Sequence, residues 1–533
     1  MIQTVLLNGN IITLDNRRPR ASAIAISYGR IVALGQDDQI RPLIDSATET
    51  LNLDGRTVLP GLTDAHLHWE AQSRALKSVD VFEVSSKESA LERVAERATK
   101  TATGEWITGQ GWAQDLWADR AFPSKSDLDS VAPRNPVYLS AKSGHAGWAN
   151  SAALAAAGIT DATPDPEGGQ IMRDAKGAAT GILLETAMEI VEEQIPNPSP
   201  EQLADMMEDA QALALKSGLT MIHDFDEPSC LVALQILRER GKLGLRALKQ
   251  INQPWLDAAL DTGIRRGFGD DWIRIGALKL FADGALGPKT ALMFEPYEGE
   301  PENYGMALVE KEEMVELVSR ASEFGLPSSI HAIGDKAVHD VLDVFEIVRR
   351  EEAERGEPVV SRRHRIEHVQ IIHPRDVGRL AELDVIASMQ PIHATSDMVT
   401  ADRYWGDRNR LAYNPRLQLD HGARVAFGSD APVEPFAPLL GIHAAITRQR
   451  NGLPAGGWYP EARLSLDESL LGFTQGPAYA AGMEDRLGKL GEGFLADLIV
   501  LDRDITQVAP DAIPELKVLG TMVDGRWRYR NFD

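Results

Sequence analysis

The middle of the chain alternates short apolar runs with amphipathic helical stretches, such as residues 203–217 and 311–325. Strands that alternate with helices indicate βαβ units and a parallel sheet, and eight such units close into a barrel. Eight runs have the length and composition of buried strands: 57–66, 219–225, 245–251, 273–281, 327–332, 363–368, 385–390 and 424–430. We therefore expect an α/β fold with a (β/α)₈ barrel of the TIM type.

Both ends of the chain have a different pattern, made of short strands and tight turns. Apolar runs flank Asn8-Gly9 and Tyr28-Gly29 near the start, and Asp524-Gly525 near the end, and each pair predicts a hairpin. Because isolated hairpins are barely stable, we expect the two ends to build one small β domain together. This domain comprises residues 1–56 and 485–533, and the barrel domain comprises residues 57–484.

One interval between the predicted barrel strands is too long for a single helix. Residues 69–205 contain further strand patterns, EWITGQGW and PVYLSAKSG, and loops rich in Pro and Gly. We interpret this interval as an insertion after the first strand that caps the mouth of the barrel.

The composition narrows the class of protein. Hydrophobic residues make up 43% and charged residues 25% of the 533 residues, as in a soluble globular protein. The single cysteine, Cys230, excludes an intramolecular disulfide and fits a reducing cytosol. A net charge of −24 opposes contact with phosphate backbones, so we expect no nucleic-acid partner. The sequence shows no signal peptide or membrane span, so we expect a cytoplasmic protein, with a homodimer as a reasonable assembly.

Metal-ligating residue types stand at the ends of several predicted strands. His66 and His68 are two apart where a strand emerges, so their side chains point to the same face. His331, His368 and Asp430 end three later strands. Each one alone fits a satisfied buried polar residue, but burying all of them unpaired would be costly. Imidazole and carboxylate ligands suit zinc or a similar metal, and the carboxyl ends of barrel strands form the catalytic face.

Lys279 lies inside the apolar run IGALKLF, where alternation aims it into the barrel. A buried ammonium group is costly, and a nearby cation would make it more so. Two interpretations are open at this point. The lysine pairs with Asp283 or another carboxylate, or CO₂ converts it into an anionic carbamate whose two oxygens bridge two metals.

The motifs GALKLFADGALGPKTA, HAIGDKAVHDVLDVFE, HRIEHVQ, ASMQPIHA and AFGSDAPVEP resemble the amidohydrolase superfamily. More narrowly, they resemble its YtcJ-like branch, amidohydrolase family 3, which includes N-substituted formamide deformylase. The similarity extends from PGLTDAHLH to GEGFLADLIVLD. The resemblance implies a β-sandwich for the terminal domain and a binuclear centre, with zinc as the default and iron, manganese, cobalt or nickel open. In that centre His66, His68 and Asp430 bind one metal, His331 and His368 bind the other, and carboxylated Lys279 bridges them.

The insertion departs from the family pattern in one place. It reads SGHAGWANS, with Ser143 where relatives usually have Asp. His145 is retained, and we expect it to contact the substrate as a donor to the carbonyl oxygen. Trp148, His223 and His393 are further expected substrate-binding residues.

The resulting expectation is a hydrolase that cleaves a carbon–nitrogen bond, other than a peptide bond, in a small-molecule substrate. Metal-activated water attacks, and Asp430 carries the proton to the leaving amine. A mononuclear deaminase is the first alternative, but such enzymes lack the barrel lysine and carry a Glu where this chain has Ala332 to Asp335. An ester or lactone hydrolase is a second. A binding protein that lost catalysis is a third, which the six filled ligand positions oppose.

Overall fold

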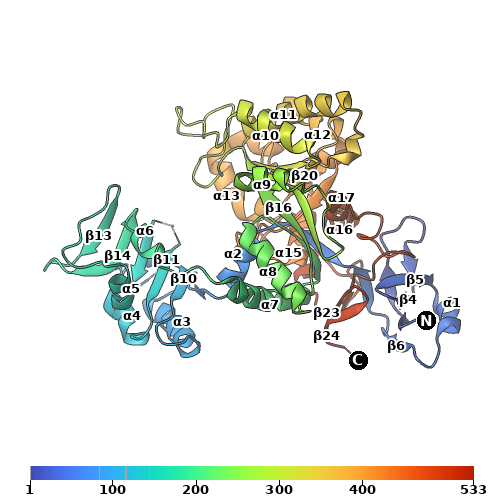
Figure 1. Cartoon of the computed structure of the whole chain (residues 1–533), viewed down its shortest axis with the longest axis horizontal. Coiled ribbons are helices and arrows are strands. Elements are labelled where there is room, and N and C mark those ends of the chain that lie inside the picture. Colours follow the sequence, from blue (N-terminus) through green and yellow to red (C-terminus); the bar gives the residue numbers. More distant parts are fainter. Residues whose placement is uncertain (1, 83, 115–116, 143–144, 533) are drawn as a thin grey trace. The chain divides into compact units, whose positions relative to one another are not determined.

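Eight parallel strands form the central sheet of the computed structural model, which describes residues 2–82, 84–114, 117–142 and 145–532 (Figure 1). Their spatial order follows the sequence, and every neighbouring pair is parallel. The strands are β8 (Leu62–Leu67), β15 (Leu219–Asp224), β16 (Arg246–Asn252), β17 (Ile273–Phe281), β18 (Ser328–Ala332), β19 (Arg365–His368), β20 (Ile386–Met389) and β21 (Val425–Phe427).

Hydrogen bonds join the end of the first strand, β8, to the residues that follow the last strand, β21. We call this junction the seam. The Asp430 N–H donates to the His66 carbonyl at 2.7 Å, and the His68 N–H donates to the Ala431 carbonyl at 2.8 Å. The Asp64 carboxylate accepts the N–H and the hydroxyl of Ser429, at 3.0 and 2.5 Å. The sheet is therefore a nearly closed barrel, which confirms the predicted TIM-type core.

Helices cover the outside of the barrel (Figure 1). Apolar side chains of α10 and α11, such as Val318 and Phe345, share one core cluster with Ile330 and Ile366 of the barrel strands. This packing buries the strands on their outer face, as parallel sheets require. The helices are α7 (Pro200–Lys216), α8 (Pro228–Glu239), α9 (Leu256–Asp261), α10 (Lys311–Glu323), α11 (Asp335–Glu354), α12 (Arg379–Glu382), α13 (His393–Trp405), α14 (Pro415–Asp420), α15 (Pro438–Thr447), α16 (Leu466–Gly472) and α17 (Gln475–Ala481).

The predicted strand 57–66 is two strands in two different sheets. Its first part, β7 (Thr57–Pro60), pairs with strands of the chain ends, and only the second part, β8, joins the barrel. The break falls at Gly61, where an added Cβ would lie 2.3 Å from the Thr220 side chain. The chain therefore crosses between the sheets where only glycine fits, and the terminal sheet continues past the boundary expected at residue 56.

The chain ends form two sheets, of strand order β5-β4-β1-β6 and β24-β23-β22-β7-β2-β3. Leu6 and Ile24 of one sheet share an apolar core with Val58 and Leu498 of the other. Both termini lie on the same side of the molecule (Figure 1). The strands are β1 (Thr4–Leu7), β2 (Asn10–Ile12), β3 (Arg20–Ala21), β4 (Ala23–Ser27), β5 (Arg30–Gly35), β6 (Glu49–Asn52), β22 (Leu498–Leu501), β23 (Val518–Val523) and β24 (Arg526–Arg530).

Two of the three predicted hairpins are present in these sheets. Strands β4 and β5 pair around Tyr28-Gly29, and β23 and β24 pair around Asp524-Gly525. The hairpin predicted at Asn8-Gly9 is wrong, because β1 and β2 belong to different sheets. Both edges of β1 are occupied by β4 and β6, so the strand that follows has to pair elsewhere.

Residues Gln72–Met206 form a second compact unit, separate from the unit of Met1–Ala71 and Met207–Asp533. Its six-stranded sheet has helices on both faces. Val137 and Leu139 of β11 share a cluster with Val94 of α3, whereas the intervening Tyr138 shares another with Leu154 of α5. The elements are β9 (Val79–Asp80), β10 (Ile107–Trp112), β11 (Val137–Ala141), β12 (Ala146–Ala149), β13 (Gly169–Arg173), β14 (Ala179–Glu185), α3 (Lys87–Lys100), α4 (Lys125–Val131), α5 (Ser151–Ala156) and α6 (Glu189–Glu192).

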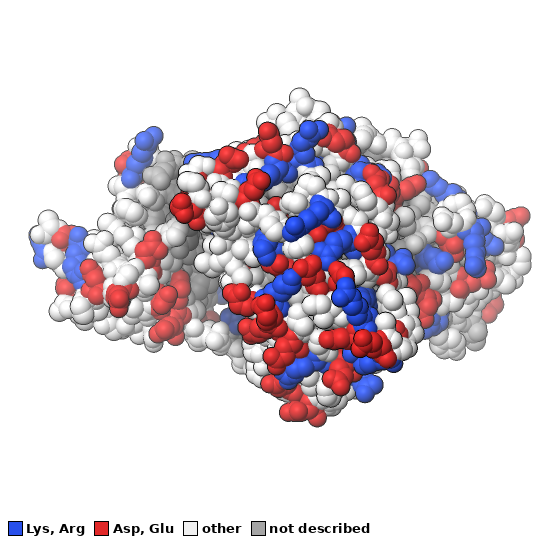
Figure 2. Space-filling view, turned by 90° about the horizontal axis from the view of Figure 1, so that it is seen from above, with Lys and Arg blue, Asp and Glu red and all other residues white. Residues whose placement is uncertain are grey.

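Charged side chains of both signs are interspersed over the face in Figure 2. The excess of acidic residues is therefore not gathered into one patch on this face. Among the helices of the described residues, none has the length and apolar character that crossing a membrane requires.

Candidate metal centre

The predicted ligands converge at the carboxyl ends of the barrel strands. His66 lies in β8, His331 in β18 and His368 at the end of β19. The imidazole of His368 has its centroid 4.8 Å from that of His66 and 4.6 Å from that of His331. Because parallel strands end at one rim, residues far apart in the sequence meet there.

Asp430 joins the two histidines of the first strand. Its Oδ1 lies 3.5 Å from Nε2 of His66 and 3.6 Å from Nε2 of His68. Ligand atoms that share a tetrahedral zinc ion at about 2.0–2.1 Å are about 3.3 Å apart, so this spacing fits a metal. Nε2 of His66 is buried and has no hydrogen-bond partner. Burial raises the pKa of Asp430 to about 6. A cation would satisfy both groups.

An unusual backbone conformation orients two of the predicted ligands, His368 and Asp430. His368 has φ +76° and Asp430 has φ +62°, in the left-handed region that non-glycine residues rarely adopt. Simple alternation along β19 would place Glu367 and His368 on opposite faces. The left-handed turn at His368 brings its imidazole to the rim as well. Such strained positions concentrate at functional sites.

Lys279 is buried in β17, and its Nζ has no hydrogen-bond partner. The ammonium group lies 4.8 Å from the centre of the Phe225 ring and 4.3 Å from that of Phe281. Burial lowers the pKa of Lys279 to about 8, although the charges of Glu367 and Asp430 oppose this. The amine is therefore a buried group without a fixed polar partner.

Asp283 is not the partner of Lys279 that the sequence left open. Its Oδ1 accepts the backbone N–H of Ile333 at 2.9 Å. Its Oδ2 accepts those of Leu292 and Gly334, at 2.9 and 2.8 Å. The carboxylate therefore organises the loop after β17, and the pairing with Lys279 is excluded.

Glu367 is a site residue that sequence reasoning missed. Its Oε2 lies 2.7 Å from Nδ1 of His66, and Arg365 contacts both carboxylate oxygens. Burial alone would raise the pKa of Glu367, but the charge of Arg365 and the hydrogen bond from His66 hold it well below its usual range. The available signal was a carboxylate directly before His368 in a buried strand.

Asp226 was also missed. Its Oδ1 lies 3.1 Å from Nδ1 of His68. Its Oδ2 accepts the backbone N–H groups of Glu70 and Ala71 at the start of α2 (Trp69–Ala75), at 2.5 and 3.1 Å. Asp226 therefore fixes both the imidazole and the segment that follows it.

His393, at the start of α13, also faces Asp430. Its Nε2 lies 3.8 Å from Oδ2 of Asp430, is buried and has no hydrogen-bond partner. Burial lowers the pKa of His393 to about 4, so the ring is neutral at pH 7. Its Nδ1 lies 3.4 Å from Nε2 of Gln370.

Two of the predicted substrate contacts, Trp148 and His223, are fully buried. Trp148 is fully buried in the core of the inserted unit, and its indole N–H donates to the Ser124 carbonyl at 2.8 Å. His223 is fully buried in β15, and its Nδ1 lies 3.0 Å from a guanidinium nitrogen of Arg365. The role of both residues as substrate contacts stays a prediction.

His145 lies at the start of β12, with 71% of its side chain exposed. Its Nδ1 is 3.0 Å from Oε2 of Glu185, a residue with left-handed φ of +51° at the end of β14. Ser143, where the sequence departs from the family pattern, lies outside the described residues.

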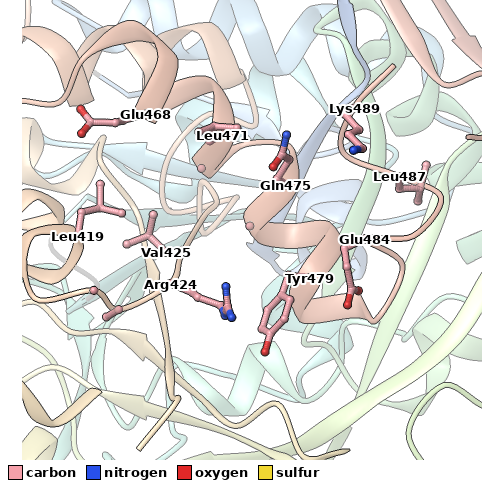
Figure 3. A pocket seen from close by; sticks show the side chains of 14 residues that line it. Leu419, Arg424, Val425, Glu468, Leu471, Gln475, Tyr479, Glu484, Leu487 and Lys489 are labelled. Carbon is pink, nitrogen blue, oxygen red and sulfur yellow. The ribbon is translucent and has the colours of Figure 1, made fainter. Parts of the chain in front are cut away.

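A hollow lies at the opposite, amino end of β21 (Figure 3). Its charged residues already have partners. Glu484 lies 2.6 Å from Arg363, and Lys489 lies 3.2 Å from Asp15. The hollow therefore lacks the unpaired buried groups of the first site.

The nearly closed parallel barrel, with His and Asp side chains clustered at its strand ends, defines a TIM-barrel protein with a candidate metal-binding site. Residues 49–529 match the model of the Amidohydrolase family, and the chain belongs to that family. The resemblance inferred from the motifs is therefore confirmed.

Curated relatives align with almost the whole chain. Protein LONG AFTER FAR-RED 3 of Arabidopsis thaliana is 32% identical over 98% of this chain and 91% of its own length. Putative amidohydrolase YtcJ of Bacillus subtilis is 31% identical over 98% of both chains. N-substituted formamide deformylase of Arthrobacter pascens is 30% identical over 99% of this chain and 98% of its own.

Among solved structures, an uncharacterised metal-dependent hydrolase from Pyrococcus furiosus superimposes with a TM-score of 0.78 and 30% identity. The match covers 94% of this chain and 99% of that one. Together these similarities support a hydrolase of the amidohydrolase family, whose members are generally metal-dependent.

Proposed function

We propose that this protein is a metal-dependent hydrolase that cleaves an amide-type carbon–nitrogen bond in a small, non-peptide molecule. The observation that carries this proposal is the group of His66, His68 and Asp430, beside the unpaired buried amine of Lys279. The relative named N-substituted formamide deformylase supports the choice of a carbon–nitrogen bond.

The donor set fits two divalent ions, which we propose to be zinc. His66, His68 and Asp430 would hold one, and His331 and His368 the other. A carbamate on Lys279 would contribute one oxygen to each. The ammonium group would first lose one proton. The neutral amine would then add CO₂ through a new N–C bond and lose a second proton, so that an unpaired cation becomes an anion. When bound, the metals lower the pKa of water and polarise the scissile carbonyl.

The proton transfers fall to Asp430. Its Oδ1 faces His66 and His68, whereas its Oδ2 faces His393 at 3.8 Å. One oxygen can therefore serve as a ligand while the other accepts the proton of the attacking water. As the C–O bond forms and the C–N bond breaks, Asp430 returns this proton to the leaving amine.

A substrate contact is proposed for His393, whose Nε2 lies 3.8 Å from Oδ2 of Asp430. Phe281 is 41% exposed, and its ring centroid lies 5.1 Å from that of His331, so it offers an apolar surface beside the centre. We propose that the substrate carries an apolar group next to its scissile bond.

The test is a panel of N-substituted formamides and acylated amines, incubated with protein whose zinc content has been measured. We expect release of a primary amine, with activity lost after chelation and restored by zinc. Matched esters, lactones and amino-heterocycles complete the panel. Cleavage of esters alone, or release of ammonia from the heterocycles, would replace the proposed bond. No turnover by zinc-loaded protein would favour a binding role.

A further inference from the structure

The five histidines around Asp430 and Lys279 differ in what holds their second ring nitrogen. A neutral imidazole has one N–H and one lone pair, and the partner of one nitrogen decides which the other carries. If the partner of one ring nitrogen is an acceptor, that nitrogen carries the proton and the other nitrogen has a lone pair that can bind a metal. If the partner is a donor, that nitrogen carries the lone pair and the other nitrogen carries the proton.

Four of the histidines are held by oxygen acceptors. Glu367 and Asp226 accept from Nδ1 of His66 and His68, at 2.7 and 3.1 Å. Nε2 of each ring is then the nitrogen that faces Asp430. The other two pairs are His368 Nδ1 with Gln390 Oε1 at 2.8 Å, and His331 Nε2 with the Gly284 carbonyl at 2.9 Å.

His393 is held differently. Nε2 of the Gln370 amide is 3.4 Å from its Nδ1, and this nitrogen can only donate. In the structure the Gln370 Oε1 faces the Tyr413 hydroxyl at 3.0 Å, and this hydroxyl also lies 2.9 Å from Oδ2 of Asp397. With the amide in this orientation, Nδ1 of His393 accepts the hydrogen bond and the ring proton lies on Nε2, which faces Asp430.

We propose that these partners divide the five histidines into four metal ligands and one hydrogen-bond donor, and that the donor is His393. The proposal rests on the metal-dependent function above. The competing assignment groups His393 with His368 and Asp430 as ligands, since their donor atoms lie within 4.8 Å of one another. That assignment needs a lone pair on Nε2 of His393, where Gln370 places the proton.

Metal content separates these two assignments. Wild type, His393→Asn, His331→Asn and the exposed His421→Asn would be loaded with zinc against a competing chelator, and bound zinc counted per chain. We expect His393→Asn and His421→Asn to keep the wild-type zinc count and an affinity within about threefold. His331→Asn should lose an ion or bind it at least 10-fold more weakly. Equal losses in His393→Asn and His331→Asn would overturn the proposal.

The ring proton can be observed directly. In protein labelled with ¹⁵N-histidine, long-range ¹H–¹⁵N spectra distinguish the two tautomers, and His393→Asn assigns the signals. We expect the Nε2–H form of His393 in wild type. Gln370→Glu supplies an acceptor and should convert it to the Nδ1–H form, whereas Gln370→Asn tests amide position alone. An Nδ1–H form in wild type would overturn the proposal.

The metal-dependent function can fail separately from this inference. If His331→Asn holds as much zinc as wild type, with the same affinity, the proposed centre is wrong. The spectrum of His393 still reports its tautomer in that case, and the Nε2–H form would then describe a buried donor in a protein without the metal site.

Discussion

The two ends of the barrel differ in how their buried histidines are held. At the amino end of β19, Nδ1 of His364 accepts the Ser328 N–H at 3.0 Å, and Nε2 lies 2.9 Å from the Glu352 carboxylate. At the carboxyl end, Nε2 of His66 and Nζ of Lys279 have no partner. Since an unsatisfied buried polar group costs free energy, the contrast marks where an external ligand belongs.

The comparison teaches that a polar interior is not by itself a site. Both ends hold buried histidines and carboxylates, and the hollow in Figure 3 is lined by charged residues. Unpaired buried polar atoms occur at both ends, such as Ser328 Oγ at the amino end, but at the carboxyl end they are the His66 and Lys279 nitrogens close to Asp430. Variants at the two ends should therefore respond differently to metal.

The largest effect is expected for Asp430→Asn. The amide keeps one oxygen for a metal but cannot accept and return a proton. We expect kcat to fall by about 10²–10⁴-fold, with zinc still bound. The measurements are the rate of amine release and zinc per chain, with Asp511→Asn as an exposed control. Near-normal kcat would remove Asp430 from the proton transfer.

Lys279→Met should affect stability and metal binding in opposite directions. Methionine removes a buried charge at similar volume, so metal-free protein should gain about 1–4 kcal/mol. The same change deletes the proposed bridge, so we expect zinc to raise the Tm of the wild-type protein but not that of the variant. Thermal unfolding with and without zinc measures both. A metal-free variant that is less stable than wild type would indicate that the amine has a structural partner.

The amino end should respond to pH without regard to metal. Burial lowers the pKa of His364 to about 4, below the unfolded value of about 6.5. As the pH falls from 6.5 to 4, the unfolded state takes up the proton first, so the free energy of unfolding should drop by roughly 1–3 kcal/mol. Urea unfolding at pH 7.0 and 4.5 measures this loss. His364→Gln should reduce it, and an unchanged pH dependence would contradict the assignment.

The smallest effect is expected in the hollow at the amino end. Glu484→Gln breaks the ion pair with Arg363, but 42% of the Glu484 side chain is exposed. Solvent screening limits the expected loss to less than about 1 kcal/mol. Zinc content and kcat should stay at wild-type values. A loss of metal in this variant would erase the distinction between the two ends.

The barrel and the residues proposed as metal ligands could be predicted because both follow local rules. Parallel strands read as apolar runs, and His66, His68 and Asp430 follow directly where such runs end. The division of residues 57–66 into two strands could not be predicted, because both halves are buried and form one continuous apolar run in the sequence. Pro60-Gly61 was the only local sign of the crossing.

The partners of the ligands could not be predicted in the same way. Glu367 meets His66 across 301 positions of chain, and Asp226 meets His68 across 158. Such pairs exist only once the barrel has formed, and no spacing rule specifies them. The proposed role of His393 depends on the orientation of the Gln370 amide, which no sequence pattern specifies.

The position of the seam implies that the proposed metal centre also stabilises the closure of the barrel. Asp64 and Ser429 meet across 365 positions of chain, and the residues beside them, His66 and Asp430, are the proposed ligands of one ion. That ion would cross-link the first and last strands of the barrel. Its departure would leave the wall held at this point by hydrogen bonds alone, so the empty enzyme should open here first.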